Sequence, residues 1–397
     1  MFKNNKNLIF LFLGQLISFT GDSIYMIALP WLILDITNSS TTTALITMSS
    51  YLPTLIFGIF IGGIVDNYSK KKIMLISDFL RCIIVLFFPI FILSGYKSTI
   101  LLGILAFFIS LSGVPFYPAR DSLIPNIVPI KRLDKANSII AISNQIAHII
   151  GPFIAGILVS VIGIVHLFTF DAITFIISMI FINFIIEKDV IKKNLRLNTN
   201  HYFLGGIRYL KKNKGLLILF YITIINNFFI MGPAIIGVPV FVKNILDNSF
   251  KTLGLMETFL AIGMMLGSFI VIKITKKIPI KYILIIGIII DGVTFFPFYW
   301  LNSPKYSIIA MLIHGIGIPM ITISRTLLIQ KTVPKNIQGR VFTLFHMAVI
   351  GTSAISISAV GIILDFIAIN QLFIMFGFFA MSCSLIALMS SKFLSLK

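Results

Sequence analysis

The chain has 397 residues, of which 58% are hydrophobic and only 11% are charged. Soluble domains carry about 25% charged residues, and a mean hydropathy of +1.04 leaves too few polar side chains to cover a surface in water. These values exclude a soluble enzyme and indicate an integral membrane protein. The net charge of +19 does not indicate nucleic-acid binding. The basic residues form short clusters between apolar runs, as in loops that face anionic lipid.

Taken in chain order, the apolar runs predict an all-α protein with twelve membrane-spanning helices. A spanning helix needs about 20 predominantly apolar residues. The first run follows a short basic segment and is too long for a signal peptide, so we expect it to be retained. The twelve runs lie at approximately 8–35, 42–65, 73–94, 99–119, 136–160, 164–186, 215–242, 252–272, 282–301, 306–330, 341–364 and 370–391.

The basic residues alternate between the two sides of the predicted membrane. Of the 32 Lys and Arg residues, 26 fall in the two tails and the even-numbered loops, and four fall in the odd-numbered loops. Cytoplasmic loops carry the excess of Lys and Arg. The pattern therefore predicts a multi-pass protein of the cytoplasmic membrane with both termini in the cytoplasm.

A long polar stretch between the sixth and seventh runs divides the chain. We expect a six-helix bundle over residues 1–187, a cytoplasmic linker over 188–214 and a second six-helix bundle over 215–397. Within the linker, Ile207 and Leu210 follow Phe203 at helical spacing, and three lysines come next. This pattern predicts an amphipathic helix on the inner leaflet, with a plain solvated linker as the alternative.

The two predicted bundles repeat one another in sequence. The segment LIPNIVPIKRLDKAN (123–137) aligns with LIQKTVPKNIQGRVF (328–342) at an offset of 205 residues. The Leu-Ile and Val-Pro pairs coincide, and Lys135 aligns with Arg340. Two six-helix halves in the same orientation are typical of secondary transporters built from parallel repeats.

The loop between the second and third runs carries a recognisable motif. The segment GGIVDNYSKKKIML (62–75) resembles the signature loop of the major facilitator superfamily, in which a Gly and an Asp precede basic residues. Asn67 and Ser69 depart from the usual pattern, where a basic residue and a Gly are common. The positions that match are Gly62, Asp66, Lys70 and Lys71.

Further segments are similar to the macrolide-efflux branch of drug–proton antiporters. They include GDSIYMIALPWLILDIT, PARDSLIPNIVP and ANSIIAISNQIAHIIGPFIAG. Within the last, Gly151, Pro152 and Gly156 look like the antiporter motif of the fifth helix, with Ala155 in place of a Gly. This resemblance covers essentially the whole chain and implies the major facilitator fold.

Helix geometry gives these motif residues a physical role. Gly62 allows two helices to approach closely, and Asp66 can cap the N-terminus of a neighbouring helix and meet the positive end of its dipole. The resemblance suggests that this neighbour is the eleventh helix, which begins near Arg340. Such a contact would form in one conformation and break in the other. Gly151, Pro152 and Gly156 predict a kinkable helix, although a simple bend is the alternative.

Asp22 lies in the middle of the first apolar run. A central Asp costs about 2.5–3.5 kcal/mol to insert into a membrane, and such residues usually face the bundle interior and mark an ion or substrate pathway. We expect Asp22 to take up and release a proton. The alternative is a structural hydrogen bond, for example to Asn226 or Asn227 in the corresponding helix of the second half.

Other charged residues lie within the predicted spans. Asp78 and Arg81 are one helical turn apart in the third span and can pair on one face, either as a gate or as an ion pair that makes burial tolerable. We expect them near the cytoplasmic side of the membrane. Asp171, Glu257 and Asp291 are further candidates for proton or substrate binding.

The parallel repeats and the intramembrane carboxylate predict a secondary transporter that works by alternating access. The resemblance implies export of amphiphilic small molecules, drug-like or macrolide-like. The absence of a nucleotide-binding motif implies that the energy comes from an ion gradient or from the substrate's own gradient, and the resemblance implies exchange for protons. We expect a monomer that contacts membrane lipid and uses no cofactor, metal ion or nucleic acid. The alternatives are an exporter of a natural metabolite, such as a siderophore or a lipid-like molecule, or a non-transporting scaffold or sensor.

Overall fold

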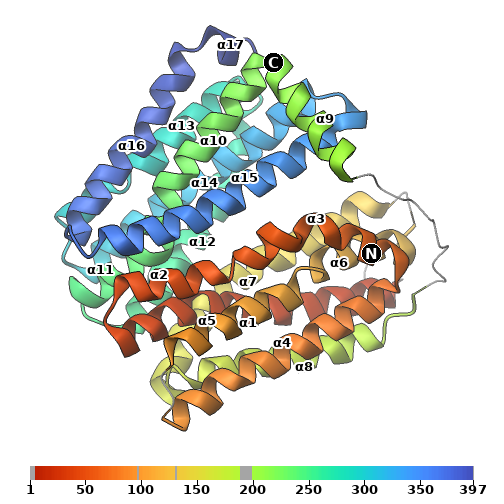
Figure 1. Ribbon diagram of the computed structural model, residues 1–397. Coiled ribbons are helices and arrows are strands. Elements are labelled where there is room, and N and C mark those ends of the chain that lie inside the picture. The colour runs from red at the N-terminus through yellow and green to blue at the C-terminus, as the bar shows by residue number, and fades with distance from the viewer. Residues whose placement is uncertain (1–4, 96–97, 130–131, 188–198, 397) are drawn as a thin grey trace. The chain divides into compact units, whose positions relative to one another are not determined.

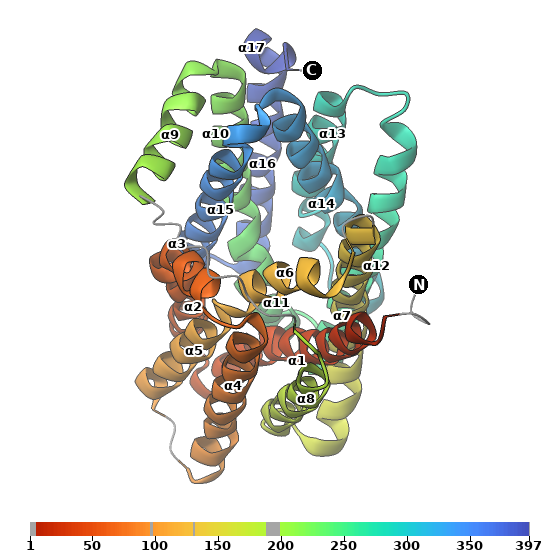
Figure 2. The ribbon, with the colours of Figure 1, turned by 90° about the vertical axis from the view of Figure 1, so that its right-hand side faces the viewer.

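The computed structural model describes residues 5–95, 98–129, 132–187 and 199–396 (Figures 1 and 2). The side chains of 59, 60, 62–64, 66, 134, 199–204 and 336 also lie outside the description. Every regular element in these ranges is helical, and the chain divides into two compact units, residues 1–197 and 198–397. Each unit is considered by itself below.

The helices of the first unit follow the predicted apolar runs. They are α1 (Lys6–Thr37), α2 (Ser40–Ser49), α3 (Leu52–Asn67), α4 (Lys70–Leu93), α5 (Thr99–Gly113), α6 (Phe116–Ile127), α7 (Leu133–Ile162) and α8 (His166–Asn183). Side chains cap several helix starts, because the first N–H groups of a helix lack intrahelical partners. Asn5, for example, accepts from the backbone N–H of Leu8 at 3.2 Å.

The helices of the second unit begin with the linker helix. They are α9 (Thr199–Lys212), α10 (Lys214–Gly232), η3 (Pro233–Gly237), α11 (Val238–Asn244), α12 (Phe250–Ile274), α13 (Ile280–Val293), η4 (Phe296–Tyr299), α14 (Pro304–Thr332), α15 (Lys335–Ile363), α16 (Ile369–Met389) and α17 (Ser391–Leu394). The π-helical turn η3 joins α10 to α11 within one span.

Eleven helical segments in the described ranges are long and apolar enough to cross a membrane. The remaining predicted span, 42–65, is not one continuous helix, because α2 ends at Ser49 and α3 starts at Leu52. At the break, the Ser110 hydroxyl donates to the carbonyl of Ser50 at 2.5 Å, so a neighbouring helix satisfies a backbone group there. Pro53 follows in the first turn of α3, where a missing N–H costs little.

The two units pack their helices by the same scheme. In the first unit, α1 lies against α7 and α8, and α4 lies against α8. In the second unit, α10 lies against α15 and α16, and α13 lies against α16. The first spanning helix of each unit therefore contacts the fifth and sixth, and the third contacts the sixth. This correspondence agrees with the parallel sequence repeat.

Candidate functional site

An ion pair joins α4 to α1 in the middle of the first unit. The Arg81 guanidinium donates to both carboxylate oxygens of Asp22, with Nη1 3.1 Å from Oδ1 and 3.2 Å from Oδ2. The Arg81 side chain is 4% exposed and that of Asp22 is 25% exposed. Within the first unit, the partner of Asp22 is thus Arg81.

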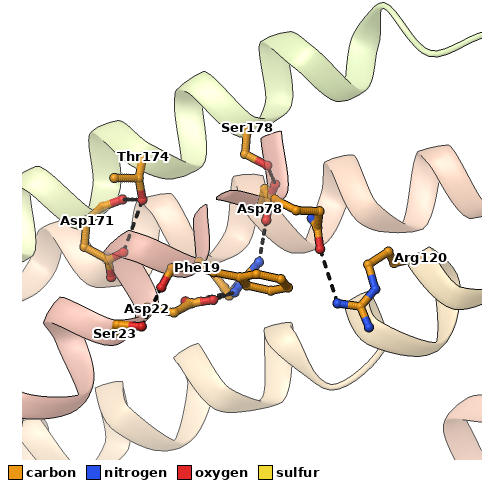
Figure 3. A network of polar contacts seen from close by, with 10 residues as sticks. Phe19, Asp22, Ser23, Asp78, Arg120, Asp171, Thr174 and Ser178 are labelled. Carbon is orange, nitrogen blue, oxygen red and sulfur yellow. Dashed lines mark hydrogen bonds and ion pairs between the residues drawn. The ribbon is translucent and has the colours of Figure 1, made fainter. Parts of the chain in front are cut away.

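Asp78 holds the other end of the same guanidinium. Its Oδ1 lies 2.5 Å from Arg81 Nη2, and its Oδ2 accepts from the Ser178 hydroxyl of α8 at 2.7 Å (Figure 3). The expected pair between Asp78 and Arg81 is present. However, Arg81 lies at the middle of α4, not toward one end, because α4 begins at Lys70, earlier than the predicted span.

Two aromatic rings cover the guanidinium of Arg81. Its Cζ lies 4.3 Å from the centre of the Phe175 ring and 4.8 Å from that of Phe116. Cation–π contacts of this kind strengthen when water is excluded. The rings and carboxylates together fix Arg81 in one position, which aims its Nη1 at Asp22.

Asp171 of α8 lies close to the same network. It is 1% exposed, and its Oδ1 is 3.4 Å from the Thr174 hydroxyl (Figure 3). Gly21 of α1 makes this approach possible, since a Cβ atom there would lie 2.3 Å from Asp171 Oδ1 and 2.1 Å from Thr174 Oγ1. Asp171 interacts electrostatically with both Asp22 and Arg81.

The charges of this network do not balance when every carboxyl group is ionised. Asp22 and Asp78 both bind the guanidinium of Arg81, and Asp171 adds a third carboxyl group close to the Gly21 turn of α1. A buried charge without a full partner costs several kcal/mol in a membrane protein. A proton or a cationic group of a ligand offsets such an excess of negative charge.

The glycine-proline motif of α7 packs directly on α1. A Cβ atom at Gly151 would lie 2.6 Å from Ser23 Cβ and 3.0 Å from the carbonyl oxygen of Thr20. Pro152 lies inside the helix, and both Pro152 and Gly156 are buried. The motif therefore brings α7 against the turn of α1 that carries Asp22.

A second cation, Arg120, lies beside α1 at Gln15 and Phe19, on the N-terminal side of Asp22. Arg120 of α6 has its Cζ 5.6 Å from the Phe19 ring and 5.2 Å from the Tyr117 ring, and its Nη1 lies 3.4 Å from Gln15 Oε1 (Figure 3). Asp121 also accepts from Arg120, at 2.8 Å. Aromatic faces beside a cation suit amphiphilic ligands.

The second unit has a buried polar cluster of its own. Asn226 Nδ2 of α10 donates to Asp291 Oδ2 of α13 at 3.1 Å, and Asp291 Oδ1 lies 3.5 Å from His314 Nε2 of α14. The other ring nitrogen of His314 is 2.7 Å from the Thr294 hydroxyl. As Arg81 and Asp22 do in the first unit, Asn226 and Asp291 join the first spanning helix to the third.

The remaining predicted polar residues of this unit lie apart from that cluster. Asn227 faces α15, where it donates to the Ser353 hydroxyl at 3.0 Å and to the carbonyl of Val349 at 3.1 Å. Glu257 of α12 is partly buried, and within the described part of the chain it has no hydrogen-bond or ion-pair partner.

Glu187, just beyond α8, caps the start of α4. Its carboxylate accepts from the backbone N–H groups of Lys70 and Lys71 at 3.0 and 3.2 Å and from the Ser69 hydroxyl at 2.5 Å. The Lys71 ammonium donates to the carbonyl of Asn183 at 2.6 Å. A carboxylate at this position meets the positive end of the helix dipole. Only its place just after the sixth apolar run could have signalled this role.

The other residues of the loop motif are described in part. The surroundings of Gly62 and the side chain of Asp66 lie outside the description, and so does the cap predicted for Asp66. Arg340 of α15 lies against α9, where a Cβ atom at Gly205 would be 2.5 Å from Arg340 Nη1. This contact holds the linker helix on the second unit. Among the described residues, no group of His, Cys, Asp and Glu side chains could hold a metal ion.

Repeated bundles of spanning helices, each with buried polar side chains joining its first helix to its third, define a multi-pass membrane transporter for small molecules. The chain belongs to the Major Facilitator Superfamily, whose sequence profile matches residues 11–359. This assignment confirms the predicted fold and establishes a transporter rather than an enzyme.

Known relatives are similar over nearly the whole chain. The chain is 23% identical to the uncharacterized MFS-type transporter YfiS of Bacillus subtilis, over 99% of this chain and 95% of the relative. It is 22% identical to the multidrug efflux pump Tap of Mycolicibacterium fortuitum, over 90% and 88%. Macrolide efflux protein A of Streptococcus pyogenes is 23% identical, over 92% and 91%.

A solved transporter shares the fold. The crystal structure of a point mutant of the nucleoside transporter NupG superposes with a TM-score of 0.82, over 96% of this chain and 98% of that one, at 14% sequence identity. A sequence identity this low supports a shared fold and says nothing about a shared substrate.

Proposed function

We propose that this protein exports small amphiphilic molecules, drug-like or macrolide-like, across the cytoplasmic membrane in exchange for protons. Two relatives that span most of the chain, Tap and macrolide efflux protein A, are efflux proteins by name. The sequence resemblance to drug–proton antiporters supports the same direction of transport.

The proposed exchange for protons is supported mainly by the excess of carboxyl groups over basic groups around Arg81. Asp22 and Asp78 both bind this one guanidinium, and Asp171 adds a third carboxyl group close to the Gly21 turn of α1. Asp22 is the most exposed of the three carboxylates. Asp22 is therefore the group that water and substrate reach first. In the proposed cycle, Asp22 takes a proton from outside as substrate leaves, loses it to the cytoplasm and then favours the next substrate.

In this proposal, helix contacts near the network around Arg81 change during the transport cycle. Gly151, Pro152 and Gly156 let α7 bend against the Asp22 turn of α1. At the start of α4, Lys70 and Lys71 bind Glu187 through their backbone N–H groups. We assign Gly62, Asp66 and Arg340 to the same conformational switch, on the resemblance of the loop motif.

The proposal also includes topology and assembly. Both termini and the linker lie in the cytoplasm, because Lys and Arg concentrate in the corresponding loops. The protein acts as a monomer of two six-helix bundles. Asn226, Asn227 and Glu257 contribute polar groups to the second bundle.

Transport by purified protein in liposomes with an internal pH dye tests this function directly. A panel of macrolides, cationic dyes and lipids is offered, and substrate flux and proton flux are recorded together. The proposal expects a macrolide or cationic dye to move with an opposing proton flux. Transport of only lipids, or of a drug with no proton movement, would overturn the corresponding part of the proposal.

A further inference from the structure

Two lysines from distant parts of the sequence meet at one end of the second unit. Lys214 starts α10, and Lys392 lies in the short helix α17 near the end of the chain. Lys214 lowers the pKa of Lys392 below its usual value. It does so through its side chain, which lies close to that of Lys392, and through its positive charge. Like charges repel, so the fold holds these ammonium groups together against their repulsion.

Packing of α17 on α10 holds the two lysines in place. A Cβ atom at Gly215 would lie 2.7 Å from the carbonyl oxygen of Lys392, so the two backbones are in close contact. Phe393 is 0% exposed and anchors α17 in the apolar core. Lys281 of α13 also donates to the carbonyl of Leu394. The position of Lys392 is therefore a consequence of the fold rather than of a free tail.

The lysine pair borders a surface depression of about 490 Å³ between α9, α10 and α17. Figure 2 shows α9 and α17 at the same end of the second unit. Among the described residues that line the depression, none is acidic. They are Tyr209, Lys212, Asn213, Lys214, Gly215, Lys392 and Ser395.

The depression lies at the boundary of a spanning segment. The membrane span that contains α10 begins at Lys214 itself. A lysine at the end of a spanning helix lies at the level of lipid headgroups, and basic pockets at this level bind anionic headgroups. The ammonium groups of Lys212, Lys214 and Lys392 match a phosphate group, whose oxygens accept several charge-assisted hydrogen bonds.

We propose that this depression is a binding site for a phosphate group, supplied by the headgroup of an anionic phospholipid such as phosphatidylglycerol. Bound phosphate would relieve the repulsion between Lys214 and Lys392 and would tie α9 and α17 to the start of α10. The site is separate from the network around Arg81 and does not depend on which substrate is transported.

Native mass spectrometry of the purified full chain tests the site without any transport assay. The probes are phosphatidylglycerol, phosphatidylcholine and inorganic phosphate, each added separately to the same detergent solution. We expect phosphatidylglycerol to be retained in preference to phosphatidylcholine. In the Lys214→Gln/Lys392→Gln variant, its affinity should fall about 30-fold, the equivalent of about 1 kcal/mol for each lysine.

The matched control removes two lysines elsewhere at the same end of the unit. Lys276 and Lys277 are exposed in the connection between α12 and α13 and do not line the depression. Lys276→Gln/Lys277→Gln should retain phosphatidylglycerol as the original chain does. Equal loss in both double variants, or no loss in either, would overturn the site. If inorganic phosphate binds as tightly as the lipid, the lipid source is wrong and the phosphate site stands.

Folding of the variants is checked in the same samples. Lys214 and Lys392 are exposed, so their replacement by Gln should leave the melting temperature within a few degrees. If the double variant unfolds, the single variant Lys392→Gln replaces it, and an unchanged affinity there overturns the proposal.

Discussion

Arg81 and Asp22 meet across 59 residues of sequence, with the guanidinium 3.1 Å from the carboxylate. The contact joins the centre of α4 to the centre of α1. Asp22 therefore carries a negative charge that a basic neighbour only partly offsets, because Arg81 is shared with Asp78. In the proposed exchange, a proton bound by Asp22 would weaken its attraction to Arg81 and with it the contact between α1 and α4.

Replacement of Asp22 by Asn should abolish uphill efflux driven by a pH gradient. The amide keeps the size of the side chain and some hydrogen bonding to Arg81, but it cannot bind or release a proton. Downhill equilibration of a neutral substrate should survive. Proteoliposomes with and without a pH gradient separate the two activities.

Asp35→Asn is the control for this variant, since Asp35 is an exposed carboxylate of the same helix. It should leave uphill efflux intact. Concentrative efflux by Asp22→Asn at the original rate would show that Asp22 is structural, and Asp171 or Glu257 would become the next candidate.

Removal of Arg81 should be more destabilising than removal of its partners. Arg81→Gln leaves the buried Asp78 and the partly buried Asp22 without this cation, and loss of one partner of a buried pair costs about 3–5 kcal/mol. The triple variant with Asp22→Asn and Asp78→Asn should recover much of that loss. Both cysteines are buried and free, so a thiol-reactive dye reports unfolding in detergent.

If Arg81→Gln alone melts at the same temperature as the original chain, the ion pairs contribute nothing to the fold. If the triple variant is the least stable of the set, the charges themselves are not the source of the cost.

Substitution of Gly21 should disturb the contact between α1 and α8. An Ala Cβ would lie 2.1 Å from Thr174 Oγ1, so the helices must separate or Thr174 must turn away. Overpacking of this kind costs about 1–3 kcal/mol. We expect Gly21→Ala to lower the melting temperature and to reduce transport.

Gly103→Ala is the matched control in the same unit, because the nearest atom to its Cβ would be Ile46 Cγ1 at 3.8 Å. Its helix propensity improves, so it should be neutral or stabilising. Equal melting temperatures for the two variants would mean that α1 and α8 do not pack closely at Gly21.

Replacement of Glu187 by Gln should weaken the start of α4. The amide can still accept a hydrogen bond, but the charge that meets the helix dipole is gone, at a cost of about 0.3–1 kcal/mol. We expect normal expression, a small loss of stability and a changed transport rate. Asp121→Asn, which removes an exposed carboxylate paired with Arg120, should have little effect. If Glu187→Gln transports at the original rate, the contact of Glu187 with Lys70 and Lys71 is not part of the proposed conformational switch.

Cysteine labelling tests the topology. In a background that lacks Cys82 and Cys383, a cysteine at Lys211 should be protected from an impermeant reagent added outside intact cells. A cysteine at Asn302, exposed between η4 and α14, should react. The opposite pattern would invert the orientation that the positive charges predict.

Hydropathy and charge were enough to predict the helical class, the repeated halves and the position of most spans. Each of these depends on composition within a window or on spacing along the chain. The break between α2 and α3 is not visible in a hydropathy window. At this break, the hydroxyl of Ser110 in another helix donates to the carbonyl of Ser50.

The site was predictable only as far as its residues lie close in sequence. Asp78 and Arg81 are one turn apart, so their pairing follows from helix geometry. The partner of Asp22 depends on how α1 and α4 pack, which the sequence pattern did not reveal. The cluster of Asn226, Asp291 and His314 joins three helices and could not be assembled from sequence for the same reason.

The π-helical turn η3 has a consequence for comparing this chain with its relatives. A π-turn accommodates one extra residue in a helix, and each residue of an α-helix advances the side-chain direction by about 100°. A helical wheel drawn continuously from α10 into α11 therefore assigns the wrong faces beyond Pro233. An alignment with a relative that has a regular seventh helix needs a one-residue gap within Pro233–Gly237, and without that gap equivalent positions downstream would be mispaired.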